Sequence, residues 1–198
     1  LSEEGASVVI ADINEEGAKA AAAALPTAIA VRTDVSDPDS VAAMVKAAVD
    51  TFESVDMFHA NAGVESTVVP VAAFDLADFE KVFAVNVRSA FLGAAAAVRQ
   101  MMAQPDRGKI VFTASIAGLK GDPGVSVYVA SKHAVIGLAR SLMKETGPLG
   151  IRVNVVAPGP VETRMMRPLE KGLAALAGLD AGQFQAALST AIPLGRYA

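Results

Sequence analysis

Three side chains in one stretch of the sequence could together exchange a proton with an alcohol or a ketone. Tyr128 and Lys132 are four residues apart, and Ser115 lies thirteen residues before the tyrosine. On a helix, Tyr128 and Lys132 would project from the same face. A phenol can donate or accept a proton, and a nearby ammonium should lower the phenol pKa from about 10. A serine hydroxyl can hold the substrate oxygen, so the spacing indicates a carbonyl or alcohol site.

Each of these residues also has an explanation that involves no chemistry. A tyrosine and a lysine four residues apart are common on solvated helix faces, and a serine at a strand end is often only a turn former. The surrounding elements favour the catalytic interpretation. The segment KIVFTA (109–114) is predicted as a buried strand that ends at Ser115, and a helix that carries Tyr128 and Lys132 is predicted from about residue 127 to Gly147.

Apolar segments alternate with alanine-rich helical segments along the whole chain, and no linker or internal repeat interrupts them. Strands with little polar alternation are buried on both faces, which is typical of parallel sheets. The repeated strand–helix order predicts a single α/β domain over residues 1–198, with a doubly wound, Rossmann-like parallel sheet in a three-layer α/β/α arrangement. The predicted strands are 6–12, 28–34, 55–60, 109–114 and 151–158, and the predicted helices are about 15–25, 38–52, 76–103 and 127–147.

The composition argues against several classes of function. The chain has 198 residues, a net charge of −4 and no basic cluster, so nucleic acid and anionic membrane are not expected partners. We find no apolar run near the ~18 residues of a membrane span and no signal-peptide pattern, so we expect a cytoplasmic protein. There is no cysteine, and the two histidines, His59 and His133, are far apart, so no metal site is expected.

Each predicted strand ends in a polar or glycine-rich group, and such strand ends form the ligand crevice of a doubly wound sheet. Asp12 ends the first strand, where an acidic residue bonds the ribose hydroxyls of NAD and would repel the 2′-phosphate of NADP. The alternative is that Asp12 or Asn14 merely caps the next helix. The other strand ends could be simple turns or a rigid loop; they are Asp34-Val35, Asn61-Ala62-Gly63, Ser115 and Pro158-Gly159-Pro160.

Taken together, these motifs resemble the short-chain dehydrogenase/reductase family over nearly all of residues 5–165. Asn61-Ala62-Gly63 is similar to the family's NAG motif, and Asn86 in VFAVNVRSAFLG matches its helix asparagine. Ser115, Tyr128 and Lys132 match its catalytic trio at the expected spacing. NVVAPGPVETRM is similar to the family's proline-glycine motif and the threonine that follows it.

The resemblance implies an oxidoreductase that interconverts a secondary alcohol and a ketone. Tyr128 would exchange a proton with the substrate oxygen, and Lys132 would lower its pKa and hold the nicotinamide ribose. Ser115 would orient the carbonyl, and Asn86 would hold a water that connects Lys132 to solvent. The alternative for Asn86 is a mid-helix amide that bonds the local backbone.

The resemblance also assigns cofactor contacts, with NAD favoured over NADP because of Asp12. Asp34-Val35 would contact the adenine, and Val161 and Thr163 the nicotinamide amide. The alternative for Thr163 is an N-cap of the following helix. The whole cofactor set is Asp12, Asp34, Val35, Asn61, Ala62, Gly63, Tyr128, Lys132, Pro158, Gly159, Val161 and Thr163.

One feature of the family is absent. Its glycine-rich turn should precede Asp12 by about 20 residues, and only eleven residues precede Asp12 here. The end IPLGRYA similarly stops before the family's last strand. We therefore expect a fragment that lacks the first strand of the sheet and its C-terminal end.

The substrate and the assembly are less specified. Residues 164–192 are predicted to form a variable lid whose apolar side chains either cover a pocket or pack the lid onto the domain. Few basic residues lie there, so a small apolar or alicyclic alcohol or ketone is expected. Small residues in helices 88–103 and 128–146 favour a homo-oligomer, with a tetramer expected. A non-catalytic NAD-binding module and an epimerase or dehydratase remain the alternative functions.

Overall fold

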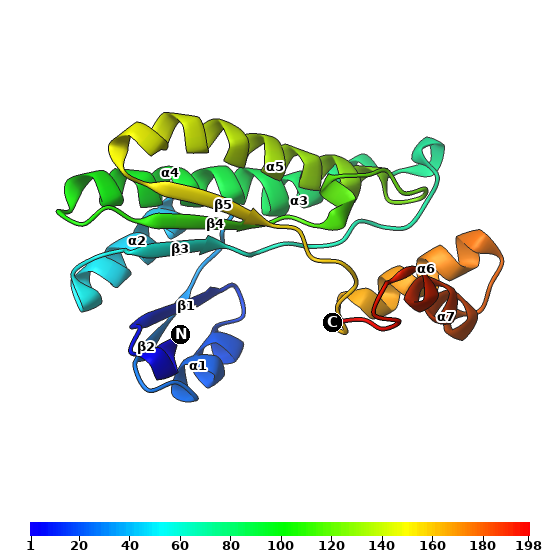
Figure 1. Ribbon diagram of the computed structural model, residues 1–198, viewed down its shortest axis with the longest axis horizontal. Coiled ribbons are helices and arrows are strands. Elements are labelled where there is room, and N and C mark those ends of the chain that lie inside the picture. Colours follow the sequence, from blue (N-terminus) through cyan, green and yellow to red (C-terminus); the bar gives the residue numbers. More distant parts are fainter. The chain divides into compact units, whose positions relative to one another are not determined.

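The computed structural model describes all residues from Leu1 to Ala198, and strands alternate with helices along it (Figure 1). Its contacts divide it into two compact units, each assembled from separate stretches of sequence. Unit 1 comprises residues 1–62, 88–112 and 139–154, and unit 2 comprises residues 63–87, 113–138 and 155–198. The expectation of one domain over residues 1–198 stays a prediction.

The first two strands of unit 1 form a parallel pair. β1 (Val8–Asp12) and β2 (Ala28–Arg32) run in register, so that Asp12 at the end of β1 lies opposite Arg32 at the end of β2. Helix α1 (Glu15–Ala23) makes the crossover between them, as a parallel connection requires.

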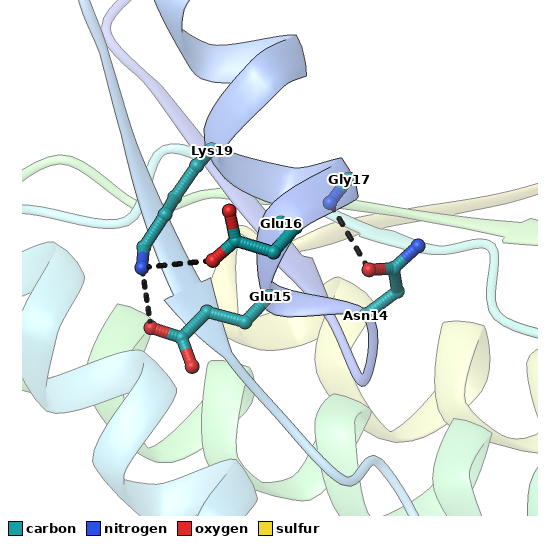
Figure 2. A network of polar contacts seen from close by, with 5 residues as sticks. All are labelled: Asn14, Glu15, Glu16, Gly17 and Lys19. Carbon is teal, nitrogen blue, oxygen red and sulfur yellow. Dashed lines mark hydrogen bonds and ion pairs between the residues drawn. The ribbon is translucent and has the colours of Figure 1, made fainter.

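The start of α1 is encoded by polar residues within one turn (Figure 2). The Asn14 side chain accepts a hydrogen bond from the N–H of Gly17 at 3.1 Å and so caps the helix. The Lys19 ammonium lies 2.8 Å from a carboxylate oxygen of Glu15 and 3.3 Å from one of Glu16. These ion pairs are exposed and screened by water, so the cap contributes more to the position of the helix start.

A second sheet contains β3 (Met57–Ala60), β4 (Lys109–Thr113) and β5 (Arg152–Val156) in that order. β3 and β4 are parallel, and the three arrows point the same way in Figure 1. On β4 the side chains of Ile110 and Phe112 are completely buried, as expected for a strand in the middle of a covered sheet.

The strands therefore form a two-stranded and a three-stranded parallel sheet, and no strand pairing joins β1 to β3. Rossmann-like α/β architecture is thus present, and every predicted strand and helix appears with ends that differ by at most two residues.

Two of the helices in unit 1 pack against each other. α2 (Pro38–Phe52) starts at Asp37, whose side chain accepts the N–H of Ser40 at 2.9 Å, and packs on α4 (Ser89–Ala103). The single helix predicted over 76–103 is a continuous helical run with a change of winding, because α3 (Leu76–Phe83) passes through the π-helical turn η3 (Ala84–Arg88) into α4.

This run, Leu76–Ala103, is long and apolar enough to cross a membrane by length and composition, so the expectation that no apolar run approaches such a span was wrong. Core helices of folded domains satisfy the same criterion. In unit 1, α4 packs against β3 so closely that a methyl group added at Gly93 would lie 2.5 Å from the ring of Phe58. Ala94 and Ala97 on the same helix are buried, as in a core helix.

Unit 2 contains the first part of α5 (Ser126–Thr146), which follows the loop after β4, and the two helices of the predicted lid. These are α6 (Met166–Ala177) and α7 (Ala181–Ala191), which pack against each other (Figure 1). The short 3-10 helices of the chain are η1 (Ser2–Glu4), η2 (Val71–Ala73), η4 (Ile116–Gly118) and η5 (Gly147–Leu149).

Candidate active site

Unit 2 brings the predicted trio together. Ser115 follows β4 and begins η4, where its Oγ accepts a hydrogen bond from the N–H of Ala117 at 3.1 Å. The Ser115 hydroxyl also shares a side-chain hydrogen bond with the phenol of Tyr128, the third residue of α5. The serine and the phenol can therefore contact one substrate oxygen together.

Lys132 lies one turn after Tyr128 and is only 4% exposed. Its Nζ donates a hydrogen bond to the carbonyl oxygen of Thr113 at 3.0 Å and lies 5.6 Å from the centre of the Tyr128 ring. Burial lowers the pKa of Lys132 to about 8, because the charged form loses hydration. The ammonium uses one of its three donors on Thr113, which leaves two for other groups.

The expected effect of Lys132 on the pKa of Tyr128 was wrong. Burial raises the pKa of the Tyr128 phenol, while the hydrogen bond with Ser115 lowers it and the negative charge of Glu65 raises it. The physical reason is the direction of the Lys132 ammonium, which is bound to the Thr113 carbonyl and lies over the ring rather than on the phenol oxygen. Loss of hydration therefore dominates.

Asn86 lies in the π-helical turn η3, is 2% exposed and holds a distant part of the backbone. Its Oδ1 accepts the N–H of Val64 at 2.8 Å, and its Nδ2 donates to the carbonyl oxygen of Val64 at 2.9 Å. Nδ2 also donates to Oγ of Ser131 at 3.0 Å, and that hydroxyl donates to the carbonyl oxygen of Tyr128 at 2.7 Å. The bonds are to residues far along the chain, so the local-backbone alternative for Asn86 does not hold.

The loop after the NAG motif is held at further points within unit 2. The Asp78 carboxylate on α3 accepts hydrogen bonds from the N–H of Thr67, at 2.8 Å, and from the Thr67 hydroxyl. These bonds lower the pKa of Asp78. The N–H of Val69 donates to the carbonyl oxygen of Gly124 at 2.9 Å. The loop is thus fixed against α3, η3 and the loop before α5.

The proline-glycine segment lies beside the end of β4 in unit 2. The carbonyl oxygen of Pro158 accepts the N–H of Ile116 at 3.0 Å, one residue after Ser115, while Gly159 is exposed. Val161 is half-buried. Thr163 is exposed, and its Oγ1 accepts the N–H of Met166, the first residue of α6, at 3.3 Å. The N-cap residue of α6 is Met165, so Thr163 is not the N-cap that the alternative predicted.

The lid packs onto the same loops. A methyl group added at Gly172 of α6 would lie 2.7 Å from the side chain of Val68, and one at Gly124 would lie 2.6 Å from Leu176. Glycine is needed at both contacts because the chains approach so closely. Leu176 and Leu179 nevertheless remain 44% and 40% exposed, so the lid packs only part of its apolar side chains.

In unit 1, Asp12 is exposed at the end of β1, and Asn14 rather than Asp12 caps α1. One Asp12 oxygen accepts the N–H of Asn14 at 2.8 Å, so the carboxylate keeps capacity for a further donor. The register places Arg32 opposite Asp12, a cation that the order of residues did not reveal.

The other strand-end residues of unit 1 have mainly local contacts. The Asp34 carboxylate accepts hydrogen bonds from the N–H and the hydroxyl of Ser36, at 2.9 and 2.7 Å, and these bonds lower its pKa. This is the turn predicted as the alternative, with Val35 half-buried inside it. Asn61 and Ala62 are exposed after β3, and Gly63, the next residue, is half-buried and belongs to unit 2.

Sequence reasoning missed two partners in the site of unit 2, Ser131 and the carbonyl oxygen of Thr113, and in unit 1 it missed Arg32 opposite Asp12. Only Ser131 had a local signal, because it lies one turn from Tyr128 and next to Lys132. No group of three or more His, Asp or Glu side chains is arranged as metal ligands in the structure, and His133 Nδ1 lies 2.9 Å from the carbonyl oxygen of Val129.

Comparison with known proteins gives relatives over most of the chain. Levodione reductase of Leifsonia aquatica is 39% identical over 179 residues, which are 87% of this chain and 67% of that protein. Galactitol 2-dehydrogenase of Agrobacterium fabrum is 35% identical over 98% of this chain and 76% of its own length. The crystal structure of NAD⁺-bound xylitol dehydrogenase has a TM-score of 0.92 and 31% identity, and it covers 100% of this chain and 79% of that one.

The family model described as short chain dehydrogenase matches residues 1–174, which include every predicted catalytic residue. The relatives above are dehydrogenases and reductases that match from 31% to 39% of aligned positions. The length of the family match and the sequence identities show that the chain belongs to the short-chain dehydrogenase family and is related to oxidoreductases.

Proposed function

We propose that this protein is an NAD-dependent oxidoreductase that interconverts a secondary alcohol and a ketone, with Tyr128 as the acid and base. The observation that carries the proposal is the phenol of Tyr128, hydrogen-bonded to Ser115 and one helical turn from the buried ammonium of Lys132. Burying an ammonium lowers the stability of a protein, so a role in the reaction explains the buried Lys132 beside Tyr128 better than a role in folding does.

The chain's own groups can handle the proton at the substrate oxygen. In alcohol oxidation, the phenolate of Tyr128 accepts the hydroxyl proton while the carbon–hydrogen bond breaks. In ketone reduction, the phenol donates that proton to the oxygen. Ser115 holds the same oxygen through its hydroxyl, and the positive charge of Lys132 offsets the negative charge that develops on the phenolate.

The residues present suit a dinucleotide. Asp12 has a free acceptor for ribose hydroxyls, and the Lys132 ammonium has two unused donors. NAD⁺, when bound, takes up the hydride from the alcohol carbon. Asp12 would disfavour the 2′-phosphate of NADP by charge repulsion, so we propose NAD as the cofactor. The remaining contacts would come from Asp34, Val35, Asn61, Ala62, Gly63, Pro158, Gly159, Val161 and Thr163.

For the substrate we propose a small alcohol or ketone with an apolar or alicyclic body. The partly exposed apolar side chains of the lid, Leu176 and Leu179, support this class. The names of the relatives include a levodione reductase and two polyol dehydrogenases, so both ring ketones and polyols belong in a first screen. We also propose a homo-oligomer, most simply a tetramer, which light scattering would test.

The test is a screen of alcohols with NAD⁺ and NADP⁺, followed by NADH or NADPH absorbance, on wild type and on Tyr128→Phe. The variant removes the proton carrier with almost no change in volume. Turnover should fall by at least about 100-fold, the low end of general acid–base contributions, while NADH binding is retained.

Two results would count against this proposal in different ways. NADH binding without turnover of any alcohol or ketone favours a non-catalytic module, and product formation without net change in NADH favours an epimerase or dehydratase. Normal turnover in Tyr128→Phe would remove Tyr128 from the mechanism.

A further inference from the structure

Glu65 is a half-buried carboxylate next to the proposed site that has no partner in the protein. It follows the NAG motif by two residues, and it forms no hydrogen bond or ion pair in a structure that describes every residue. The two carboxylates at the start of α3 differ, because Asp78 and Asp75 both accept hydrogen bonds from backbone N–H groups. A half-buried carboxylate without donors has lost some hydration and gained nothing for it.

The backbone around Glu65 is held firmly on both sides. On one side, both the N–H and the carbonyl oxygen of Val64 are bonded to the Asn86 amide, at 2.8 and 2.9 Å. On the other side, both donors of Thr67 are bonded to Asp78. The carboxylate of Glu65 is therefore presented from a fixed piece of backbone, which is the usual condition for a specific contact.

The backbone that carries Glu65 is connected to the helical turn of the reacting phenol, and the negative charge of Glu65 raises the pKa of Tyr128, after burial as the main cause. Asn86, which fixes Val64, also donates to Ser131, and Ser131 donates to the carbonyl oxygen of Tyr128. The loop that carries Glu65 and the helical turn that carries Tyr128 are thus joined by hydrogen bonds within unit 2.

We propose that Glu65 determines substrate specificity by accepting a hydrogen bond from a second hydroxyl group, so that the preferred substrates are diols and hydroxy ketones. This inference rests on the proposed alcohol–ketone activity and narrows its substrate class. An alicyclic ring with two neighbouring oxygen atoms would use both features of unit 2: the Glu65 carboxylate as an acceptor for one hydroxyl and the apolar lid as a surface for the ring.

A hydroxyl group fits this position better than an ammonium group. The pKa of Lys132 is about 8, so its ammonium carries positive charge at neutral pH beside Tyr128. A cationic substrate would be repelled by that charge, whereas a neutral hydroxyl would not. A hydrogen bond from hydroxyl to carboxylate also belongs to the stronger, charge-assisted class.

The experiment compares cyclohexanol with cis- and trans-1,2-cyclohexanediol as substrates, with NAD⁺, on wild type and three variants. Glu65→Leu removes the acceptor, Glu65→Gln keeps a neutral acceptor of the same shape, and Glu80→Gln is the control. Glu80 is an exposed carboxylate on α3 in the same unit, and its side chain makes no hydrogen bond. The measured quantity is the ratio of kcat/KM for the better diol to that for cyclohexanol.

We expect this ratio to fall at least about 10-fold in Glu65→Leu, by an intermediate factor in Glu65→Gln, and to stay constant in Glu80→Gln. A ratio in Glu65→Leu within about 2-fold of wild type, with cyclohexanol still oxidised, would overturn the inference and leave the proposed function standing. Absence of NADH formation from every alcohol tested would overturn both.

Discussion

Two buried amides in this chain hold a distant backbone in the same way, and only one lies in the proposed site. Asn86 bonds the N–H and the carbonyl oxygen of Val64, and Gln104 bonds the N–H and the carbonyl oxygen of Val55, both at 3.1 Å. Gln104 is 8% exposed and belongs to unit 1. Comparing variants of Asn86 and Gln104 therefore distinguishes the contribution of such a contact to stability from its contribution to turnover.

We predict that Asn86→Ala and Gln104→Ala destabilise the protein by similar amounts. Each variant leaves one N–H and one carbonyl oxygen without their partner, and each such loss costs about 1–3 kcal/mol when the group is shielded from water. Val64 is only half-buried, so water can compensate in part, and we expect about 2–4 kcal/mol for Asn86→Ala; Val55 is buried, so Gln104→Ala should lie in the upper part of that range. That is a large fraction of the ~5–15 kcal/mol by which domains are stable.

Activity should distinguish the two variants. Asn86→Ala also releases Ser131 on α5 and the loop before Glu65, so we expect kcat to fall at least about 10-fold. Gln104→Ala changes only unit 1 contacts and should keep kcat within about 2-fold at a temperature where both variants are folded. Asn86→Asp keeps the acceptor for the Val64 N–H and loses both donors, so it should lie between.

The assay is urea unfolding followed by circular dichroism, with activity measured on the same preparations. A loss of about 2–4 kcal/mol corresponds to a midpoint lower by about 1–2 M urea for a slope of about 2 kcal/mol/M, the middle of the usual range. A midpoint shift below about 0.2 M in Asn86→Ala would refute the stability argument. Equal losses of kcat in both variants would refute the assignment of Asn86 to the site.

Three further predictions follow from the charges. Lys132→Met should raise the free energy of unfolding at pH 7 by about 1–3 kcal/mol, because it replaces a buried ammonium, and it should abolish turnover. Since the pKa of Lys132 is lowered to about 8, the free energy of unfolding of the wild type should also rise from pH 8 toward 10.5. Urea unfolding at several pH values should show this rise in the wild type and not in the variant. NAD should be preferred over NADP by more than about 10-fold in kcat/KM. Asp12→Ala should lower this preference, because the negative charge is removed and the positive charge of Arg32 lies opposite the substituted residue. A wild-type preference for NADP would contradict the role of Asp12. Because burial raises the pKa of Tyr128, its proton-donating form should persist through neutral pH. The rate of ketone reduction should therefore be constant near pH 7 and fall above about pH 8, as Lys132 and then Tyr128 lose their protons. A rate that increases above about pH 8 would contradict this reasoning.

The order of strands and helices could be predicted from the sequence because the residues that determine each element are close together in the chain. Buried parallel strands are continuous apolar runs, and caps such as Asn14 and Asp37 mark helix starts, so the element order could be predicted to within two residues at each end. The π-helical turn at Asn86 could not, because its amide is occupied by Val64, 22 residues away. A helical periodicity does not record which distant backbone a side chain will bind.

The types of the site residues were also predictable, but their electrostatics were not. The i, i+4 spacing correctly places Tyr128 and Lys132 one turn apart, and from that spacing alone an ammonium should stabilise the phenolate. The sign of the pKa shift depends on how much water is removed and where the ammonium points. Both follow from the carbonyl of Thr113 and from packing, neither of which has a pattern in the sequence.

The same burial has opposite effects on the two groups, and this has a consequence for catalysis. It raises the pKa of the neutral acid Tyr128 and lowers that of the cationic acid Lys132 to about 8. At neutral pH the resting site therefore holds a protonated phenol and an ammonium whose charge is poorly hydrated. In the proposed ketone reduction, negative charge would develop on the phenol oxygen, and the ammonium would gain an attraction that it lacks in the resting state. That attraction would stabilise the transition state more than the ground state, which is the requirement for faster turnover.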